Sequence, residues 1–260
     1  MRRPAREPFL GLGFQRARLV RDAIGYRHPT ELPIEVLAHM RGALVRPKPA
    51  TGTRANVIRI GERAIVGIAG DLGAEQRRWA VAHELGHFEL HPGVNYVGLC
   101  TGEDMLFDYR VSGREQEANA FAAELLMPEE LYEPRCDIAK VSWTPIKKLA
   151  EEFQVSLTAA ALRLLMFTYE RMAVICCKQG EVAWSQATRD FGPRLTKGTK
   201  LDSYSLAYDF FKHGSCGAVP ETVAANAWVP GAPDELEVME HVFPMPRLGM
   251  VMCLVWFPVS

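Results

Sequence analysis

This sequence of 260 residues has no marked excess of positive or negative charge and no extended apolar stretch. Its 30 Lys and Arg residues nearly balance 31 Asp and Glu residues, for a formal net charge of −1. The bulk charge therefore does not demand a polyanion or a membrane surface as partner. No stretch approaches the roughly 20 consecutive apolar residues of a membrane span, and basic residues run through 1–22, where a signal peptide needs an apolar core. We expect a cytoplasmic protein with no membrane partner.

The cysteines lack any spacing that would indicate a disulfide framework or a thiolate metal site. No CxxC pair occurs, and the six cysteines are scattered: Cys100, Cys136, Cys176, Cys177, Cys216 and Cys253. Such a distribution is typical of reduced thiols in a reducing compartment. We interpret the adjacent Cys176 and Cys177 as core residues rather than a redox sensor. A metal-capping thiolate at Cys100 stays open as an alternative.

Hydrophobic periodicity predicts a chain of mixed helices and strands. Helical patterns cover 14–24, 32–43, 74–91 and 113–128, and two strands joined by a tight turn cover 56–60 and 63–68. The segment 146–167 is typical of two helices around QVSL, and short apolar runs after 172 indicate a small mixed or mostly β unit. With 48% hydrophobic residues, the chain can fill sizeable cores.

The stretch VAHELGHFELH, within the predicted helix 74–91, carries the clearest chemical signal. His83 and His87 are four residues apart, so their imidazoles project from one helix face and can share an ion. Zinc accepts histidine nitrogen in a four-coordinate site. Glu84, rotated by about 100°, can overhang the open position and transfer a proton between water and a leaving amine. The competing interpretation is a buried core helix whose polar residues are hydrogen-bonded.

A catalytic site of this kind needs a third protein ligand. On the predicted helix 113–128, Glu115 shares a mostly apolar face with Asn119, and an inward carboxylate is costly unless it is paired. Asn119 is placed to hold a ligating histidine by its other ring nitrogen. His91 is a poorer candidate because it lies roughly 12 Å of helix rise beyond His83, so we interpret it as a helix-end residue.

Together, RWAVAHELGHFELH and EQEANAFAAELLMP resemble the ImmA/IrrE family of zincin-like metallopeptidases. The resemblance covers about 30–130 and implies zinc ligands at His83, His87 and Glu115. It also implies a general base at Glu84 and a supporting Asn119. Glu117, on the other side of its helix, ranks well below Glu115 as a ligand. The metal itself is open, because sites of this type that bind Zn²⁺ also accept Mn²⁺, Fe²⁺ or Co²⁺.

The resemblance further implies an α+β fold with a minimal thermolysin-type domain. Its domain order would place a zincin-like metallopeptidase domain at 1–136, a helix-turn-helix-like helical segment at 137–170, and a mixed α/β, GAF-like sensor domain at 171–260. Tyr96, Tyr109 and His91 are alternative stabilisers of a tetrahedral oxyanion, among which the sequence does not choose.

The family also implies a substrate, a helix-turn-helix (XRE-type) repressor whose cleavage relieves repression of stress, phage or mobile-element genes. One alternative is a non-proteolytic partner, such as a toxin-antitoxin component, that only grips a helix-turn-helix protein. Another is DNA binding through 146–167, where Lys147, Lys148 and Arg163 are mixed with Glu151 and Glu152. A helical hairpin that only packs is the simpler interpretation of that segment.

Overall fold

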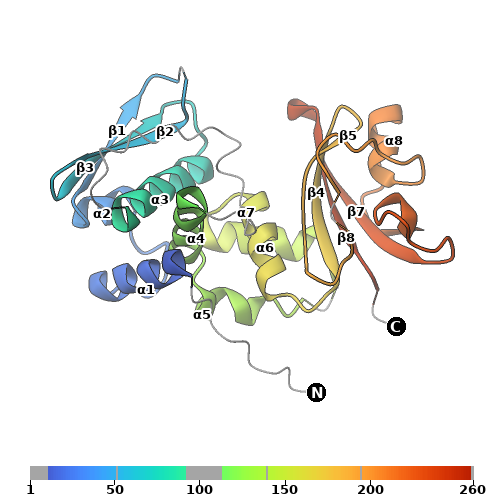
Figure 1. The fold of residues 1–260 in the computed structure, drawn as a ribbon, viewed down its shortest axis with the longest axis horizontal. Coiled ribbons are helices and arrows are strands. Elements are labelled where there is room, and N and C mark those ends of the chain that lie inside the picture. Colours follow the sequence, from blue (N-terminus) through green and yellow to red (C-terminus); the bar gives the residue numbers. More distant parts are fainter. Residues whose placement is uncertain (1–10, 51, 92–112, 139, 194, 259–260) are drawn as a thin grey trace. The chain divides into compact units, whose positions relative to one another are not determined.

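The structure is a computed structural model that describes residues 11–50, 52–91, 113–138, 140–193 and 195–258 (Figure 1). The chain divides into two compact units. The first unit comprises Met1–Arg135 and Ala150–Ala159, and the second comprises Cys136–Leu149 and Ala160–Ser260.

The first unit contains α1 (Leu12–Ile24), α2 (Ile34–Met40), β1 (Ala43–Lys48), β2 (Ala55–Ile60), β3 (Arg63–Ala69), α3 (Ala74–Leu90), α4 (Arg114–Leu126), α5 (Glu129–Tyr132) and η1 (Glu133–Arg135). Two helices, α6 (Trp143–Phe153) and α7 (Leu157–Phe167), contribute residues to both units. The second unit continues with β4 (Met172–Lys178), β5 (Glu181–Ala187), α8 (Leu206–His213), β6 (Glu221–Ala224), η2 (Ala225–Ala227), β7 (Glu237–Met245), η3 (Pro246–Leu248) and β8 (Met250–Trp256).

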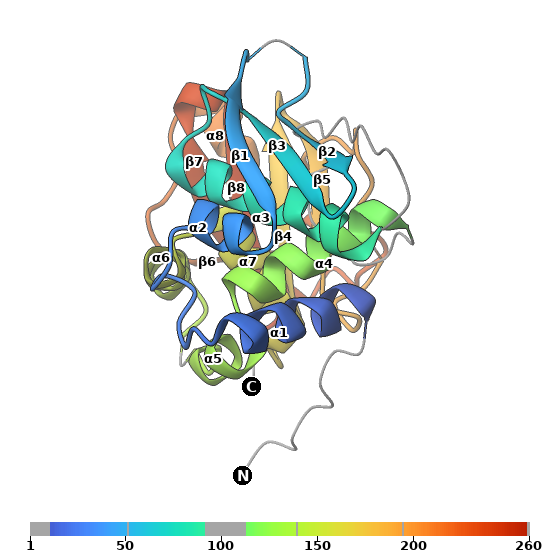
Figure 2. The same ribbon diagram turned by 90° about the vertical axis from the view of Figure 1, so that its left-hand side faces the viewer.

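The predicted hairpin and the two predicted long helices are confirmed, with α3 and α4 ending within two residues of the expected positions. The pair β2 and β3 is antiparallel, as expected. The sequence did not indicate β1, which joins the sheet parallel to β3 and gives the order β1-β3-β2. Figure 2 shows this sheet with one face toward the viewer and α3 behind it. Val57, Val66 and Ile68 are buried in the sheet.

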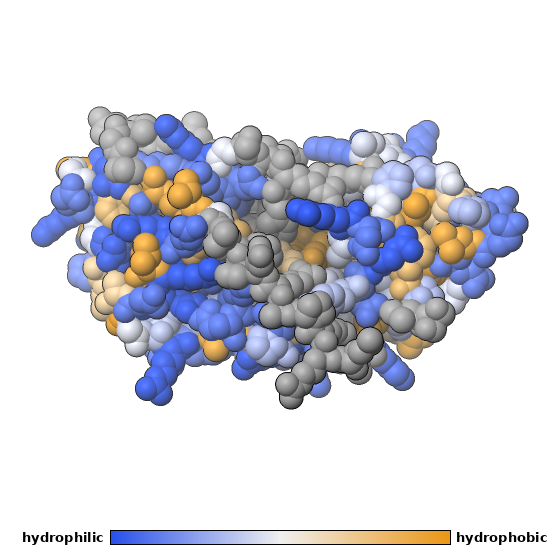
Figure 3. All heavy atoms as spheres, turned by 60° about the horizontal axis from the view of Figure 1, so that its bottom comes forward, coloured by the Kyte–Doolittle hydropathy of each residue, from blue (hydrophilic) through white to orange (hydrophobic). Residues whose placement is uncertain are grey.

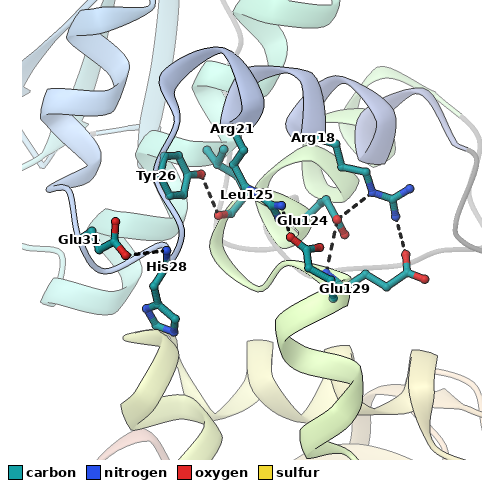
Figure 4. A network of polar contacts seen from close by, with 9 residues as sticks. Arg18, Arg21, Tyr26, His28, Glu31, Glu124, Leu125 and Glu129 are labelled. Atoms are coloured by element: carbon teal, nitrogen blue, oxygen red, sulfur yellow. Dashed lines mark hydrogen bonds and ion pairs between the residues drawn. The ribbon is translucent and has the colours of Figure 1, made fainter.

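The contact between α1 and α4 depends on a glycine and on ion pairs. A Cβ atom at Gly13 would lie 2.3 Å from the carbonyl oxygen of Glu117, so a larger residue there would push α1 away from α4. Arg18 donates from Nε to the fully buried Glu124 at 3.0 Å and pairs with Glu129 through its other end (Figure 4). These contacts fix α1 against α4 and the start of α5.

The second unit is built on one five-stranded antiparallel sheet in the order β5-β4-β8-β7-β6, which agrees with the expected small mixed or mostly β unit. Its core includes Ile175, Val238 and Trp228, and Phe210 of α8 packs against it. Cys176 and Cys177 are buried in β4, and burial raises the pKa of the Cys176 thiol to about 12. Because both side chains are buried in the strand, their interpretation as core residues is confirmed.

Glu240 on β7 is a buried carboxyl group in the second unit. Its oxygens accept hydrogen bonds from the backbone amides of Leu206 and Ala207, at the start of α8, and from Trp228 Nε1 at 2.8 Å. Burial raises the pKa of Glu240 to about 7, although these hydrogen bonds act in the opposite direction. The carboxyl group thus joins the sheet to the N-terminus of α8.

Across the described ranges, every helix is too short or too polar to cross a membrane. On the face drawn in Figure 3, hydrophobic atoms lie in separate groups among hydrophilic ones. Such scattered apolar groups are ordinary on protein surfaces, so only a contiguous group needs an explanation.

Candidate metal centre

The histidines of the HELGH stretch lie in the middle of α3 and face α4. His83 and His87 are both buried, and their Nε2 atoms lie 3.1 Å apart. The two helices approach closely here because α3 has a glycine between the histidines. A Cβ atom at Gly86 would lie 3.0 Å from the Cα of Ala118 and 3.1 Å from its carbonyl oxygen. The absence of a side chain at Gly86 therefore lets α4 bring its own polar residues to the histidines.

Glu115, in the first turn of α4, completes a three-residue cluster. Its Oε2 atom lies 3.2 Å from His83 Nε2 and 3.3 Å from His87 Nε2. The three residues are arranged so that one ligand atom from each lies within 4.8 Å of the others. The Glu115 side chain is 42% exposed whereas both histidines are buried, so the cluster has one open side.

The spacing of these atoms fits a tetrahedral zinc site. Zinc bonds of about 2.0–2.2 Å in tetrahedral geometry place neighbouring ligand atoms roughly 3.3–3.6 Å apart. The three observed separations of 3.1, 3.2 and 3.3 Å are close to that edge length. Two neutral nitrogens and one carboxylate also match the donor set of a catalytic zinc site with a fourth, open position. The residues present therefore fit a divalent cation.

Asn119 orients His83 from one turn further along α4. Its Oδ1 atom accepts a hydrogen bond from His83 Nδ1 at 2.9 Å, and its side chain is buried. With the proton on Nδ1, the lone pair of Nε2 points toward Glu115 and His87. The expectation that Asn119 would lie against the far side of a histidine in the cluster agrees with this contact.

His87 is oriented by a pair of residues that sequence reasoning had not assigned to this role. His87 Nδ1 lies 3.2 Å from His91 Nδ1, and His91 Nε2 lies 2.9 Å from Glu117 Oε2. Because the carboxylate accepts the His91 Nε2 proton, neutral His91 Nδ1 accepts from His87 Nδ1–H. His87 Nε2 is then left with its lone pair toward the cluster. The spacing of His87 and His91 by one turn was the available signal, but Glu117 depends on the placement of α4.

Glu84 is fully buried beside His83, on the same helix. Burial lowers the pKa of His83, but the hydrogen bond to Glu115 and the negative charges of Glu84 and Glu115 outweigh it, so the net pKa is raised. The pKa of His87 is lowered, chiefly by burial. The two histidines therefore differ in proton affinity although they share one carboxylate.

Some sequence-based alternatives lie elsewhere. Cys100, Tyr96 and Tyr109 fall outside the described residues. His91 caps the C-terminus of α3; it contacts Glu117 and the Nδ1 of His87, and the three-residue cluster of possible ligands does not include it.

Comparison with known families agrees with the geometry. Residues 38–165, which include the whole cluster, match the IrrE N-terminal-like domain. This chain carries an IrrE N-terminal-like domain. The family is a metallopeptidase family, and the ImmA/IrrE resemblance is thereby confirmed.

Two individual proteins are similar to parts of the chain. An uncharacterized immunity region protein 2 of Bacillus phage phi105 is 42% identical over 62 residues, which are 24% of this chain and 37% of the phage protein. The match thus spans little more than a third of that relative. A Mycobacterium tuberculosis transcriptional regulator has a similar fold, with a TM-score of 0.59 and 17% identity over 95% of this chain and 76% of that chain.

Proposed function

We propose that the protein is a zinc-dependent endopeptidase that cleaves a helix-turn-helix transcriptional repressor. The observation that carries the peptidase part is the convergence of His83, His87 and Glu115 next to the buried carboxylate of Glu84. The proposed ligands are the two Nε2 atoms and Glu115 Oε2. A zinc ion bound there would polarise a scissile carbonyl and acidify a water molecule.

The side chains of this chain would divide the remaining work. Glu84 takes the proton of the attacking water and delivers it to the leaving amine. Asn119 and the pair of His91 and Glu117 hold the two imidazoles in the tautomers that leave Nε2 unprotonated. β2 is an edge strand of the sheet and contacts α3, so an extended substrate segment would pair along it.

Two substitutions test the peptidase proposal. Glu84→Gln keeps the size and a hydrogen-bonding oxygen but cannot accept a proton, so it should retain metal and lose cleavage. His83→Ala removes a ligand and should lose both. Metal content by mass spectrometry and cleavage of a candidate helix-turn-helix repressor give the readout. A fully active Glu84→Gln variant would contradict the assigned role of Glu84.

The repressor substrate is supported by the immunity-region relative from a phage and by the family. Incubating the purified chain with a candidate helix-turn-helix repressor and zinc, followed by mass spectrometry of new termini, tests it. If the two proteins bind and no new terminus forms with any of the metals supplied, the chain is a non-proteolytic partner instead.

The five-stranded antiparallel sheet of the second unit supports its assignment as a GAF-like sensor only at the level of fold class.

DNA binding through α6 and α7 is the second candidate function, favoured by the similarity in fold to a mycobacterial transcriptional regulator. The structure supplies one observation against it. Arg163, the cation of α7, is fully buried, with its guanidinium 4.7 Å from the ring centroid of Phe167. It is therefore unable to reach a phosphate, which leaves the exposed Lys147 and Lys148 of α6. Salt-dependent binding of duplex DNA in a mobility assay would support this function.

A further inference from the structure

The outward face of the sheet in the first unit carries a contiguous group of large apolar side chains. Leu44, Ile58 and Ile65 are 39%, 42% and 39% exposed, and Ile60 is 62% exposed. The register places Ile65 directly between Leu44 on β1 and Ile58 on β2, so an apolar row crosses all three strands. Ile60 extends the row along β2. We call these four residues the outer apolar face.

From Ile58 to Ile60, the alternation on β2 is the reverse of what a half-solvated strand normally shows, whereas Ala55 and Val57 are buried in the usual way. Such a strand places polar residues outward and apolar residues inward. On β2, Ile58 and Ile60 point outward, whereas Arg59 points toward α3, where its guanidinium donates to the carbonyl oxygen of Phe88 and lies 4.2 Å from the ring centroid. Where a sequence breaks a local folding rule, a functional contact is the usual reason, and a contiguous exposed apolar group indicates a binding surface.

Cations flank the outer apolar face. The three strands contain Arg46, Lys48, Arg59 and Arg63 and no acidic residue. Arg46 and Arg63 are exposed and share the outward direction of Leu44 and Ile65, from which each is two positions away. Two copies of this face would bring like charges together, which opposes self-association. A row of large apolar side chains between the cations is also unlike a surface built to contact phosphates.

We propose that the outer apolar face binds an acidic amphipathic helix of a partner protein. The row spans two interstrand spacings, about 10 Å, which matches the roughly 10 Å diameter of a helix with its side chains. Apolar residues at i, i+3, i+4 and i+7 would cover Leu44, Ile58 and Ile65, and flanking Asp or Glu would meet Arg46 and Arg63. This binding does not depend on the proposed peptidase activity, since the face and the metal cluster have no residue in common.

Two synthetic helical peptides of about 18 residues, or five turns, test the proposal. Both carry Leu at i, i+3, i+4 and i+7, and one has Glu at the flanking positions where the other has Lys. Fluorescence anisotropy with the full chain should show the Glu peptide binding at least about tenfold more tightly, with an affinity that falls as salt rises. Ile58→Thr with Ile65→Thr should weaken binding of the Glu peptide about tenfold or more, while Thr retains the β propensity of the strands.

Matched variants separate the contribution of the flanking charges to peptide binding from effects that arise outside the outer apolar face. Arg46→Glu with Arg63→Glu should abolish or invert the preference for the Glu peptide, because the flanking charges are reversed. Leu19→Gln, at a 59% exposed position on α1 outside the face, should leave binding unchanged. Glu84→Gln should also bind the Glu peptide normally, so a failure of the proposed peptidase function would be seen separately.

Three outcomes would overturn the proposal. Equal affinity for the Glu and Lys peptides, including no measurable binding of either, would remove the argument from charge. A dimer that forms with concentration and is lost in the Ile58→Thr, Ile65→Thr variant would make the face a self-association surface. Binding of duplex DNA that is tighter than that of the Glu peptide, and lost on reversal of Arg46 and Arg63, would make it a nucleic-acid surface.

Discussion

The close approach of α3 and α4 at Gly86 makes a quantitative prediction for Gly86→Ala. The added Cβ would lie 3.0 Å from the Cα of Ala118, 3.1 Å from its carbonyl oxygen and 3.2 Å from the Cβ of Phe121. Two of these atoms are backbone and unable to rotate away, so the helices must separate by a few tenths of an ångström. Overpacking of this kind costs about 1–3 kcal/mol, and two immobile neighbours favour the upper half of that range.

The opposing contribution comes from helix propensity. Alanine is better than glycine in a helix interior by about 1 kcal/mol. The net expectation for Gly86→Ala is therefore a loss of about 1–2 kcal/mol. Because Glu115 is carried on the helix that moves, zinc affinity should fall about three- to tenfold. Propensity alone predicts the opposite sign for stability, so the measurement distinguishes the two effects.

Hydrogen exchange of α3 peptides in increasing denaturant reports the stability of the first unit alone, and competition with a chelator reports zinc affinity. Gly70→Ala is the control, since a Cβ there would meet one atom at 3.9 Å and the backbone does not have a positive φ. It should be neutral or slightly stabilising. A Gly86→Ala variant that is as stable as the parent chain and binds zinc equally well would refute the close-packing argument.

Three further substitutions follow from the structure. Asn119→Ala removes the acceptor of the His83 Nδ1 proton and should weaken zinc binding about 10–100-fold, with Asn119→Asp retaining most of the affinity in a chelator competition. Arg18→Met removes one cation from the fully buried Glu124 and should cost about 2–3 kcal/mol in chemical unfolding, whereas adding Glu124→Gln should restore part of that loss. The folded pKa of Glu240 is about 7 against a usual 4.5, so its neutral carboxyl group stabilises the folded state most below pH 4.5. Roughly 3 kcal/mol of the free energy of unfolding should be lost as the pH rises to 7. Glu240→Gln should flatten this pH dependence in unfolding experiments, and an unchanged profile would contradict the raised pKa.

Regular periodicity made α3, α4 and the β2–β3 hairpin predictable from sequence. Each signal lies within a short stretch, and the four-residue spacing of His83 and His87 determines which face of a helix they share. Glu115 and Asn119 were also identifiable because an inward polar residue on an apolar helix face needs a partner. The cluster is thus largely a property of two local patterns that meet.

The features that were missed depend on chain segments far apart in sequence. β1 contains Pro47 and pairs in parallel with β3, so its short pattern had no turn or hairpin to mark it. The side chain of Glu89, near the end of α3, is only 3% exposed because Arg16 and Arg41 reach it from positions 73 and 48 residues away. No periodicity within α3 contains that information.

Glu115 lies 32 residues after His83 and 28 residues after His87 in the chain. An ion held by all three would act as a removable cross-link that closes a loop of about that length. Closing such a loop restricts the unfolded chain, and any ion that binds only the folded form shifts the equilibrium toward it. The amount of free metal around the protein would thereby raise the free energy of unfolding of the first unit, and chelation would remove that contribution.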